Sequence, residues 1–525
     1  MHHDFDWIVI GSGFGGSVAA LRLVERGYSV LVLEQGRRFA RSDFPETNWD
    51  VRRWLWKPQW GLRGFFQMSF FRHLTVLHGV GVGGGSLGYA NTLPEPTAEF
   101  FESGPWASLA SWRTELRPHY ATARRMLGVG TNPRTFAGDE VVQQIAQKMG
   151  RRDGYRPTEV GVFFGEPREV VPDPYFGGAG PDRVGCTFCG GCLTGCRVGA
   201  KNTLDQNYLY LAERAGARIE AERTVLAIRP LERGGYRIEG THTVGGTVGF
   251  HATARRVVLA GGVMGTVPLL LRMREDHLGL PRLSTQLGQQ VRTNHEALLG
   301  VVSPDPKVDF SQGVAIASML RTDGRSHLEP VRYAAGSGFF RLLGLPYAPG
   351  NNVLQRLAGA GRAVARNPLT WLRVYGARDF ARQSQILLYM RACPETISLE
   401  LGRDLSTGLA RGLVTKVRDR SLAPRAFLPE AGALVGQFAR IVAGVPMAMA
   451  SEMLFGTPTT AHVLGGCVMA DGPERGVIDR DHRVFGYDGL YVVDGSSVSA
   501  NPGVNPSLTI TALAERAMSR VPTRG

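Results

Sequence analysis

The chain has 525 residues, of which 43% are hydrophobic and 20% charged, a composition typical of a soluble globular protein with a large buried core. Its 60 basic and 46 acidic side chains give a net charge of +14, which favours an anionic partner (nucleic acid, acidic lipid or anionic substrate) or only a basic surface kept for solubility. Without a zinc-finger or RNA-binding signature, we expect no nucleic-acid partner. We find neither a transmembrane segment nor a signal peptide, and we expect a cytoplasmic protein that is at most peripheral to a membrane.

A glycine motif follows the first predicted strand. An apolar strand over residues 6–10 runs into a G-x-G-x-x-G motif, a helical pattern follows, and a second strand ends at Glu34. In this context the motif predicts a dinucleotide site, with glycines for a tight turn, for close approach of a pyrophosphate to the helix N-terminus, and for packing of helix on strand. Glu34 is placed to accept both ribose hydroxyls of an adenosine. The candidate residues in the motif are Gly11, Gly13, Phe14 and Gly16.

A second glycine-rich loop spans residues 78–86 and contains Gly83, Gly84 and Ser86. The first motif does not choose between NAD and FAD. One dinucleotide needs one such turn, whereas a second loop without side chains suits a large flat ring that the backbone must approach closely. The two loops together favour a flavin over a freely exchanging nicotinamide. A glycine-rich surface loop is the alternative interpretation.

The third group of candidate residues lies near the C-terminus. His462 precedes a glycine pair, and Asn505 precedes Pro506 at the predicted start of a helix. A neutral histidine is the natural acceptor for the O–H proton of an alcohol near neutral pH, and a helix N-terminus can stabilise negative charge on a reduced flavin. We therefore predict an acid/base pair beside the cofactor. The alternative interpretation of His462, taken alone, is a buried core histidine whose ring nitrogens have hydrogen-bond partners and which has no catalytic role.

These blocks, with residues 200–209 and 257–262, resemble the glucose–methanol–choline (GMC) oxidoreductases, and within them the cholesterol-oxidase-like branch. The resemblance covers most of the predicted cofactor domain and is weak over about residues 300–450. It implies noncovalent FAD and oxidation of an alcohol by hydride transfer to flavin N5. It also implies that His462 is the active-site histidine and that Asn505 contacts substrate oxygen and flavin. The remaining cofactor contacts that it implies are Asp494 and Gly495 at the ribityl and pyrophosphate part, the backbone of Val225 at adenine, and Pro506 beside Asn505.

The predicted fold is α/β (α+β overall), with a Rossmann-like FAD-binding domain of GMC type and a second, substrate-binding domain built on an antiparallel sheet. We predict that the FAD-binding domain is discontinuous, over residues 1–45, 74–110, 186–300 and 455–525. The substrate-binding domain and cover take residues 46–73, 111–185 and 301–454. The resemblance implies that the substrate is the 3β-hydroxyl of a sterol such as cholesterol, or another bulky apolar alcohol, and hence a place in steroid or lipid metabolism.

Two positions depart from the family's pattern. The steroid-isomerising branch places a glutamate where this chain aligns Gln383, and because glutamine cannot act as that base we do not expect isomerisation. Tyr89 replaces an asparagine expected after the second glycine loop, which leaves the electron acceptor open between oxygen and another acceptor. The alternative enzyme is an FAD dehydrogenase of another alcohol or sugar. A flavin- or lipid-binding protein without turnover is the alternative outside the enzymes.

Four of the six cysteines lie close together, at Cys186, Cys189, Cys192 and Cys196. Their C-x2-C-x2-C-x3-C spacing matches the bacterial ferredoxin run, except that Arg197 replaces the usual proline, and the fourth cysteine of that run usually serves a different cluster. The run predicts an iron–sulfur cluster that passes electrons from FAD to a carrier. Zinc usually prefers two separated cysteine pairs, and a structural loop with buried thiols is the other alternative.

Two segments mix aromatic and basic residues, over residues 49–73 and 353–382, and residues 339–345 form an apolar loop. Basic amphipathic segments can lie on anionic lipid, and a sterol reaches its enzyme from a membrane. We therefore predict transient contact of these segments with a membrane surface. Ordinary packing of amphipathic helices against the core is the alternative.

Overall fold

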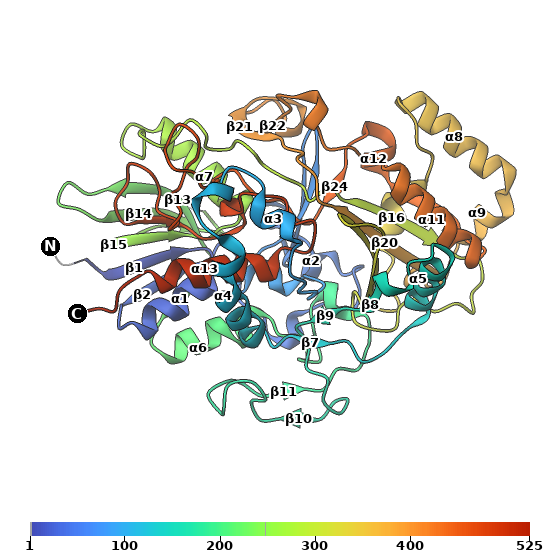
Figure 1. The fold of residues 1–525 in the computed structure, drawn as a ribbon, viewed down its shortest axis with the longest axis horizontal. Helices are drawn as coiled ribbons and strands as arrows, with labels where there is room; N and C mark the ends of the chain where they lie inside the picture. Colours follow the sequence, from blue (N-terminus) through green and yellow to red (C-terminus); the bar gives the residue numbers. More distant parts are fainter. Residues whose placement is uncertain (1–2, 247) are drawn as a thin grey trace.

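Two seven-stranded sheets lie side by side, the first in the left half of Figure 1 and the second in the right half. The structure, a computed structural model, describes residues 3–246 and 248–525. The helices of eight or more residues are α1 (Phe14–Glu25), α4 (Trp112–Met126), α5 (Ala137–Lys148), α7 (Val263–Glu275), α8 (Val353–Arg366), α9 (Pro368–Tyr375), α11 (Pro429–Ile441) and α13 (Ser507–Ser519). The shorter helices are α2 (Val51–Trp54), α3 (Ala98–Glu102), α6 (Tyr208–Arg214), α10 (Phe380–Gln383) and α12 (Ala450–Phe455).

The first sheet has a parallel centre and an antiparallel edge. Its strand order is β12 (Arg218–Glu220), β2 (Val30–Leu33), β1 (Phe5–Ile10), β15 (Gly249–Leu259), β14 (Tyr236–His242) and β13 (Arg223–Pro230), and β25 (Leu490–Val492) pairs with β15. In the parallel part, Val9 lies opposite both Val32 and Val258. Residues 7–10 and 30–33 are all buried, which is why these strands are continuous apolar runs in the sequence.

The second sheet is antiparallel throughout, and the side chains along its strands alternate between a core face and a cavity face. Its order is β19 (Gly344–Pro346), β23 (Val445–Met449), β16 (Ala297–Val302), β20 (Ser384–Arg391), β18 (Ser326–Val331), β17 (Ser318–Arg321) and β8 (Tyr155–Pro157). On β20, Leu387 and Tyr389 pack in the core cluster that includes α5 and α11, whereas Ile386 and Leu388 line a cavity on the opposite face. The predicted domain boundary at residue 300 falls inside β16.

Smaller sheets join and flank the two large ones. One is three-stranded, with the order β24 (Thr459–Thr460), β6 (Thr75–Gly79) and β5 (Phe66–Phe70). The two-stranded sheets are β3 (Trp56–Lys57) with β4 (Leu62–Arg63), β7 (Gly130–Thr131) with β9 (Glu159–Val160), β10 (Val170–Val171) with β11 (Arg183–Val184), and β21 (Ser398–Gly402) with β22 (Gly412–Lys416).

The two ends of the chain meet on one side of the first sheet. The termini lie at the same edge of the molecule, and α1 and α13 run next to each other there (Figure 1). Arg22 of α1 forms an ion pair of 2.8 Å with Glu515 of α13, and the Tyr208 hydroxyl donates to the same carboxylate at 2.6 Å. This contact places the N-terminal glycine motif and the C-terminal candidate residues around one space. Within the described ranges, no helix combines the length and the apolar character needed to cross a membrane.

Candidate active site

A cavity of about 570 Å³ runs between the two large sheets. At one end it meets the carboxyl ends of β1 and β2, where Gly11 and Glu34 line it. At the other end it meets the inner face of the second sheet, where Leu298 and Leu388 line it. Ligands of open α/β sheets bind outside the carboxyl ends of the strands, and the volume lies within the range of small-molecule sites.

The first glycine motif contains two close backbone approaches, at Gly11 and Gly16. Gly11 has a φ of 98°, and a Cβ there would lie 2.4 Å from the carbonyl oxygen of Ala260. A Cβ on Gly16 would lie 2.0 Å from the oxygen of Gly11, so this glycine allows α1 to pack on the strand end. Gly13 has space on its Cβ side and lines the cavity together with Phe14, the first residue of α1. The arrangement leaves a helix N-terminus at the cavity wall, which suits a pyrophosphate.

Glu34 lies at the far end of this part of the cavity, together with Val225. Its carboxylate accepts hydrogen bonds from the backbone N–H of Ser12 at 3.0 Å, from the Ser12 hydroxyl at 2.7 Å and from the N–H of Gly36 at 2.9 Å. Burial raises the pKa of Glu34, and these hydrogen bonds oppose the rise because they stabilise the ionised form. A buried acid at this end fits the ribose and adenine part of a dinucleotide.

The second glycine loop touches the first. Gly84 has a φ of 53°, and a Cβ there would lie 2.7 Å from the Cα of Gly13, so the two loops meet backbone to backbone. Gly84 lines the cavity, whereas Gly83 and Ser86 do not. The Ser86 hydroxyl donates to the Gly83 carbonyl at 2.7 Å and accepts from the N–H of Leu204 at 3.0 Å. Ser86 therefore fixes the shape of the loop from behind.

The C-terminal candidates complete the same cavity. Asp494, Gly495, Asn505 and Pro506 all line it, and α13 begins directly after Pro506. Asp494 accepts from the N–H of Gly262 at 2.8 Å and from that of Ser496 at 2.8 Å. Burial raises the pKa of Asp494, and it outweighs these hydrogen bonds, which lower the pKa because they stabilise the ionised carboxylate. Two backbone loops, two buried carboxylates and two helix N-termini around one elongated space fit a flavin dinucleotide.

His462 lies where the cofactor part of the cavity meets the second sheet, and it pairs with Glu296. The Nδ1 atom of His462 bonds to one oxygen of Glu296, and the other oxygen accepts from the N–H of Ala461 at 2.9 Å. The His462 side chain is 15% exposed and that of Glu296 is fully buried. Burial lowers the pKa of His462, but the Glu296 carboxylate outweighs this effect, so that the net pKa is raised. Because Glu296 holds Nδ1, the other ring nitrogen, Nε2, is left for a ligand in the cavity.

Asn505 lies next to a second buried acid, Glu329 of β18. The Asn505 Nδ2 atom is 3.4 Å from a Glu329 carboxylate oxygen, and its Oδ1 has no hydrogen-bond partner among the described residues. Asn91 lines the same cavity and is fully buried, with a φ of 55°, and neither atom of its amide is bonded to another described residue. Glu296, Glu329 and Asn91 were not identified from the sequence. Only Asn91 had a local signal, since it closely follows the second glycine loop.

The two positions that depart from the family pattern have different surroundings. Tyr89 lines the cavity, its ring contacts Phe14 with centroids 5.5 Å apart, and its hydroxyl donates to the carbonyl of Asn202 at 3.0 Å. Gln383 is the last residue of α10, and its amide donates to the Ser303 carbonyl at 3.0 Å. Gln383 does not line the cavity.

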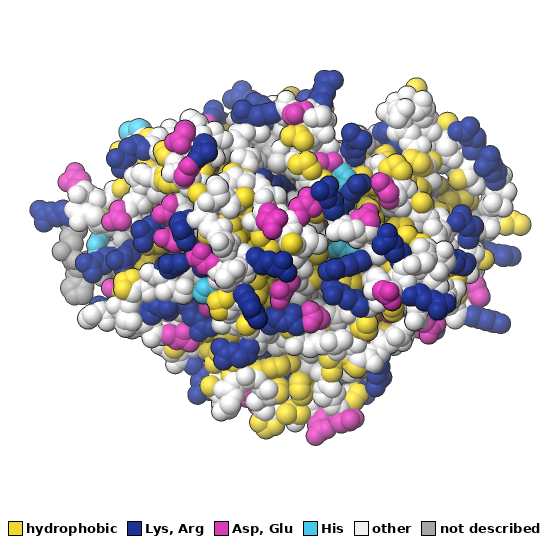
Figure 2. All heavy atoms as spheres, viewed as in Figure 1, with side chains coloured by type: hydrophobic (Ala, Val, Ile, Leu, Met, Phe, Trp, Pro, Cys, Tyr) yellow, Lys and Arg dark blue, Asp and Glu magenta, His cyan; other side chains and the backbone are white. Residues whose placement is uncertain are grey.

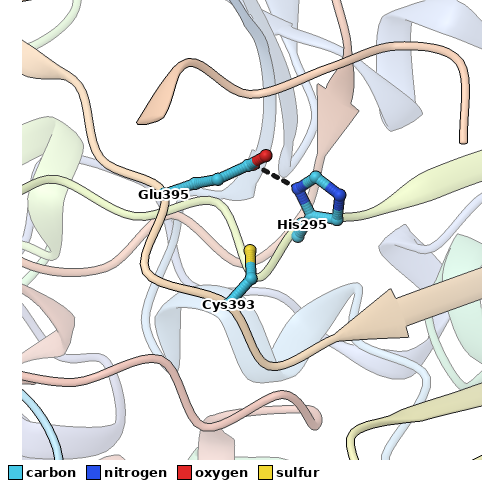
Figure 3. A group of neighbouring side chains, drawn as sticks. All are labelled: His295, Cys393 and Glu395. Carbon is cyan, nitrogen blue, oxygen red and sulfur yellow. Dashed lines mark hydrogen bonds and ion pairs between the residues drawn. The ribbon is translucent and has the colours of Figure 1, made fainter. Parts of the chain in front are cut away.

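A histidine, a cysteine and a glutamate lie together behind the active site. Figure 3 shows His295, Cys393 and Glu395 pointing toward one another, with Nδ1 of His295 bonded to Glu395. Burial lowers the pKa of His295, but Cys393 and Glu395 together raise it to about 9. His295 directly precedes Glu296 in the chain, so this charged pair anchors the segment that carries the partner of His462.

The four cysteines Cys186, Cys189, Cys192 and Cys196 do not belong to the large cavity. They all line a second, small cavity beside it. The loop that carries them includes a short 3-10 turn over residues 191–194, and Leu193 within this turn lines the large cavity.

Comparisons with known proteins agree with this geometry. Residues 444–514 match a family model described as GMC oxidoreductase, and residues 9–75 match an NAD(P)-binding Rossmann-like domain. Over its whole length the chain is 42% identical to a cholesterol oxidase of Acinetobacter baumannii, of which it covers 95%, and 42% identical to a cholesterol oxidase of Mycobacterium tuberculosis, of which it covers 92%. A solved pyridoxine 4-oxidase from Mesorbium loti shares the fold, with a TM-score of 0.62, 14% identity and 98% of each chain covered.

The fold and the site define a flavoprotein oxidoreductase that acts on CH–OH groups, with FAD as its cofactor. The chain belongs to the GMC oxidoreductase family. This confirms the predicted fold class, the family and FAD as a cofactor, whereas the noncovalent attachment of FAD and the iron–sulfur cluster stay predictions. The roles of individual residues stay predictions.

Proposed function

We propose that the protein oxidises the 3β-hydroxyl of a sterol such as cholesterol to a ketone, with oxygen as the acceptor of the electrons. The observation that carries the proposal is the pairing of His462 with Glu296 at the point where the FAD cavity meets an apolar wall. The 42% identity with two cholesterol oxidases over the whole chain supports the choice of substrate.

The apolar wall suits a bulky, rigid hydrocarbon. Its side chains come from the second sheet and from the loops that cover it, and they include Phe66, Leu298, Val302, Phe340, Leu388 and Met447. Burial of apolar surface is favourable by about 25 cal/mol per Å², so a sterol ring system gains far more binding energy from such a wall than a sugar does. A sugar would leave most of its hydroxyl groups without hydrogen bonds there.

In this proposal the side chains handle the proton, while bound FAD supplies the hydride acceptor at N5. Nε2 of His462 accepts the O–H proton, and the Glu296 carboxylate stabilises the imidazolium that results. The amide of Asn505 orients the alcohol oxygen. Gln383 lies outside the cavity, so its identity does not bear on isomerisation of the product, and the carboxylate that contacts Asn505 is that of Glu329.

The alternative proposal is an FAD dehydrogenase of another alcohol or sugar that uses a non-oxygen acceptor. It is supported by the replacement at Tyr89 and by the four cysteines that line one small cavity. A screen of sterols and sugars by flavin absorbance under argon, followed by admission of oxygen, separates the two proposals.

We also propose that α8 and α9 contact the surface of an anionic membrane. Both helices stand at one end of the molecule (Figure 1). Their exposed apolar residues include Leu354 (75% exposed), Leu369 (69%) and Leu372 (71%). Their exposed basic residues are Arg362, Arg366 and Arg373, and Figure 2 shows Lys and Arg side chains gathered along this end. Arg356 does not take part, because it is buried and donates to the carbonyl of Met453 at 2.7 Å.

The other predicted membrane segments fit this contact less well. In residues 49–73, Trp54 and Phe65 are fully buried, whereas Trp60 is 76% exposed and Phe70 is 54% exposed, so this segment is divided between the core and the surface. In residues 339–345, Phe340 lines the cavity and Leu342 is 68% exposed, so this loop connects the cavity wall to the surface.

Two experiments test these proposals. With His462→Ala we expect reduction of bound FAD by cholesterol to fall at least about 100-fold while FAD stays bound, and with the exposed control His277→Ala we expect no change. Unchanged reduction by His462→Ala would refute its role. In sedimentation with anionic liposomes at low salt, we expect Leu354→Ser with Leu372→Ser to bind less than the control Leu405→Ser, whose residue is 88% exposed on another surface. Equal binding would count against contact through α8 and α9.

A further inference from the structure

The four-cysteine loop folds back on itself around one point. Gly190 and Gly195, with φ values of 70° and 91°, bend the chain on either side of the short turn that contains Cys192. A Cβ on Gly190 would lie 2.1 Å from the oxygen of Ser311, and one on Gly195 would lie 2.0 Å from the ring of Phe44. These close approaches hold the loop in the form that brings Cys186, Cys189, Cys192 and Cys196 to one cavity.

Two of the four sulfur atoms accept hydrogen bonds from backbone N–H groups. The N–H of Phe188 donates to the Sγ of Cys186 at 3.4 Å, and the N–H of Gly199 donates to the Sγ of Cys196 at 3.3 Å. Such N–H···S bonds stabilise negative charge on sulfur and are one means by which proteins tune iron–sulfur clusters. An apolar shell surrounds the loop and includes Val160, Val162, Phe188, Ala200, Val314 and Ala317.

The spacing of the sulfur atoms separates two kinds of metal site. A single tetrahedral zinc ion, with Zn–S bonds of about 2.3 Å, holds its sulfurs about 3.8 Å apart. In the described part of the chain, the only three ligand atoms within 4.8 Å of one another belong to His295, Cys393 and Glu395. No three of the four cysteine sulfurs therefore lie within 4.8 Å of one another, although a single zinc ion would need them closer than that. A cluster spaces its cysteines more widely, because each sulfur binds a different iron atom.

We propose that Cys186, Cys189, Cys192 and Cys196 together bind one four-iron cluster. The usual ferredoxin pattern sends the fourth cysteine to another cluster, but here the fold brings all four to one cavity. Cys186 is buried and Cys189 is exposed, so the cluster has one protein-covered side and one side toward solvent.

A buried lysine connects this cluster site to the flavin loop. The Nζ atom of Lys201 donates to the carbonyls of Leu87 at 2.9 Å, Tyr89 at 3.2 Å and Cys192 at 2.8 Å. Leu193, next to Cys192, lines the large cavity. The cluster thus lies between the flavin cavity and the surface. Transfer of electrons from FAD to the cluster rests on the proposed FAD-dependent oxidation. Binding of the cluster itself does not depend on that function.

The test is metal analysis of the full-length FAD protein purified under argon and incubated with ferrous iron and sulfide. We expect about four iron atoms and four acid-labile sulfides per chain, and an electron paramagnetic resonance signal after reduction with dithionite. One zinc per chain, or no iron and sulfide after this treatment, would overturn the proposal. Failure of the proposed function alone would appear differently, as a normal iron content with no reduction of FAD by cholesterol.

Matched serine variants locate the ligands. We expect Cys186→Ser and Cys192→Ser to lose most of the iron and to keep one FAD per chain, and the control Cys393→Ser to keep both. If the buried variants fail to fold, the exposed Cys189→Ser decides the question. An altered or lost resonance signal supports the site, and an unchanged iron content and signal contradicts it.

Discussion

The carboxylate of Glu296 binds Nδ1 of His462 across 166 residues of sequence, and the same carboxylate accepts the N–H of Ala461. This pair fixes the ring in one orientation and sets its pKa above the ordinary value for histidine, against the effect of burial. The histidine that the glycine-rich C-terminal motif indicates is thus half of a charged pair whose other half lies just before β16.

We expect Glu296→Gln to change both rate and pH dependence. The base must be neutral to accept a proton, so wild-type activity falls as the pH drops through the raised pKa of His462. Removal of the carboxylate lowers this pKa, so the acidic limb of the kcat profile moves to lower pH. The maximal kcat falls about 100-fold, because the imidazolium loses its partner. Steady-state profiles from pH 5 to 9 measure this, with the exposed Glu275→Gln as control; an acidic limb that stays in place contradicts it.

Asn505→Ala should slow the chemical step and spare the cofactor. Loss of one preorganised polar group beside the reacting oxygen costs about 100- to 1000-fold in rate. Glu329 contacts Asn505 but does not line the cavity, so we expect a smaller loss, about 10-fold, for Glu329→Gln. Stopped-flow reduction of bound FAD gives both rates. A rate for Asn505→Ala equal to that of wild type would remove this residue from the site.

Glu34→Ala should weaken FAD binding. A hydrogen bond to a charged group contributes about 1.5–3 kcal/mol, which corresponds to a 10- to 100-fold rise in the Kd of FAD. Part of the effect would come from the loop, because Glu34 also accepts from Ser12 and Gly36. Titration of the FAD-free protein with FAD, followed by flavin fluorescence, measures the Kd. The exposed Glu232→Ala is the control, and an equal Kd for both variants would exclude a contact of Glu34 with FAD.

His295 should make stability depend on pH. Although burial acts against it, its pKa in the folded protein is about 9, above the unfolded value of 6.5. The stability that it contributes is complete below pH 6.5 and is lost as the pH rises through about 9. We expect Glu395→Gln to lower the free energy of unfolding by about 1–3 kcal/mol at pH 6 and by much less at pH 10. Urea unfolding at the two pH values tests this; the same loss at both would show that His295 does not titrate as stated.

The glycine loops show which features of the site can be predicted from local sequence. Gly11, Gly16 and Gly84 are needed where they stand because of turns and close backbone contacts, and such requirements leave a readable spacing. Ser86 shows the limit of this reasoning. It lies in the same motif, but it holds the loop from behind instead of lining the cavity. Spacing identifies a loop, and only packing decides which of its side chains face the ligand.

The sequence by itself determined the cofactor class, the two glycine loops and two residues that line the cavity, His462 and Asn505, because each belongs to a short, recognisable motif. The tertiary structure alone decided that Glu296 is the partner of His462 and that the four cysteines line one cavity. The first contact joins segments that are distant in the chain, and the second depends on loops packed against Ser311 and Phe44. The spacing of the cysteines can be read from the sequence, but the meeting of all four at one cavity and the pairing of Glu296 with His462 depend on tertiary packing.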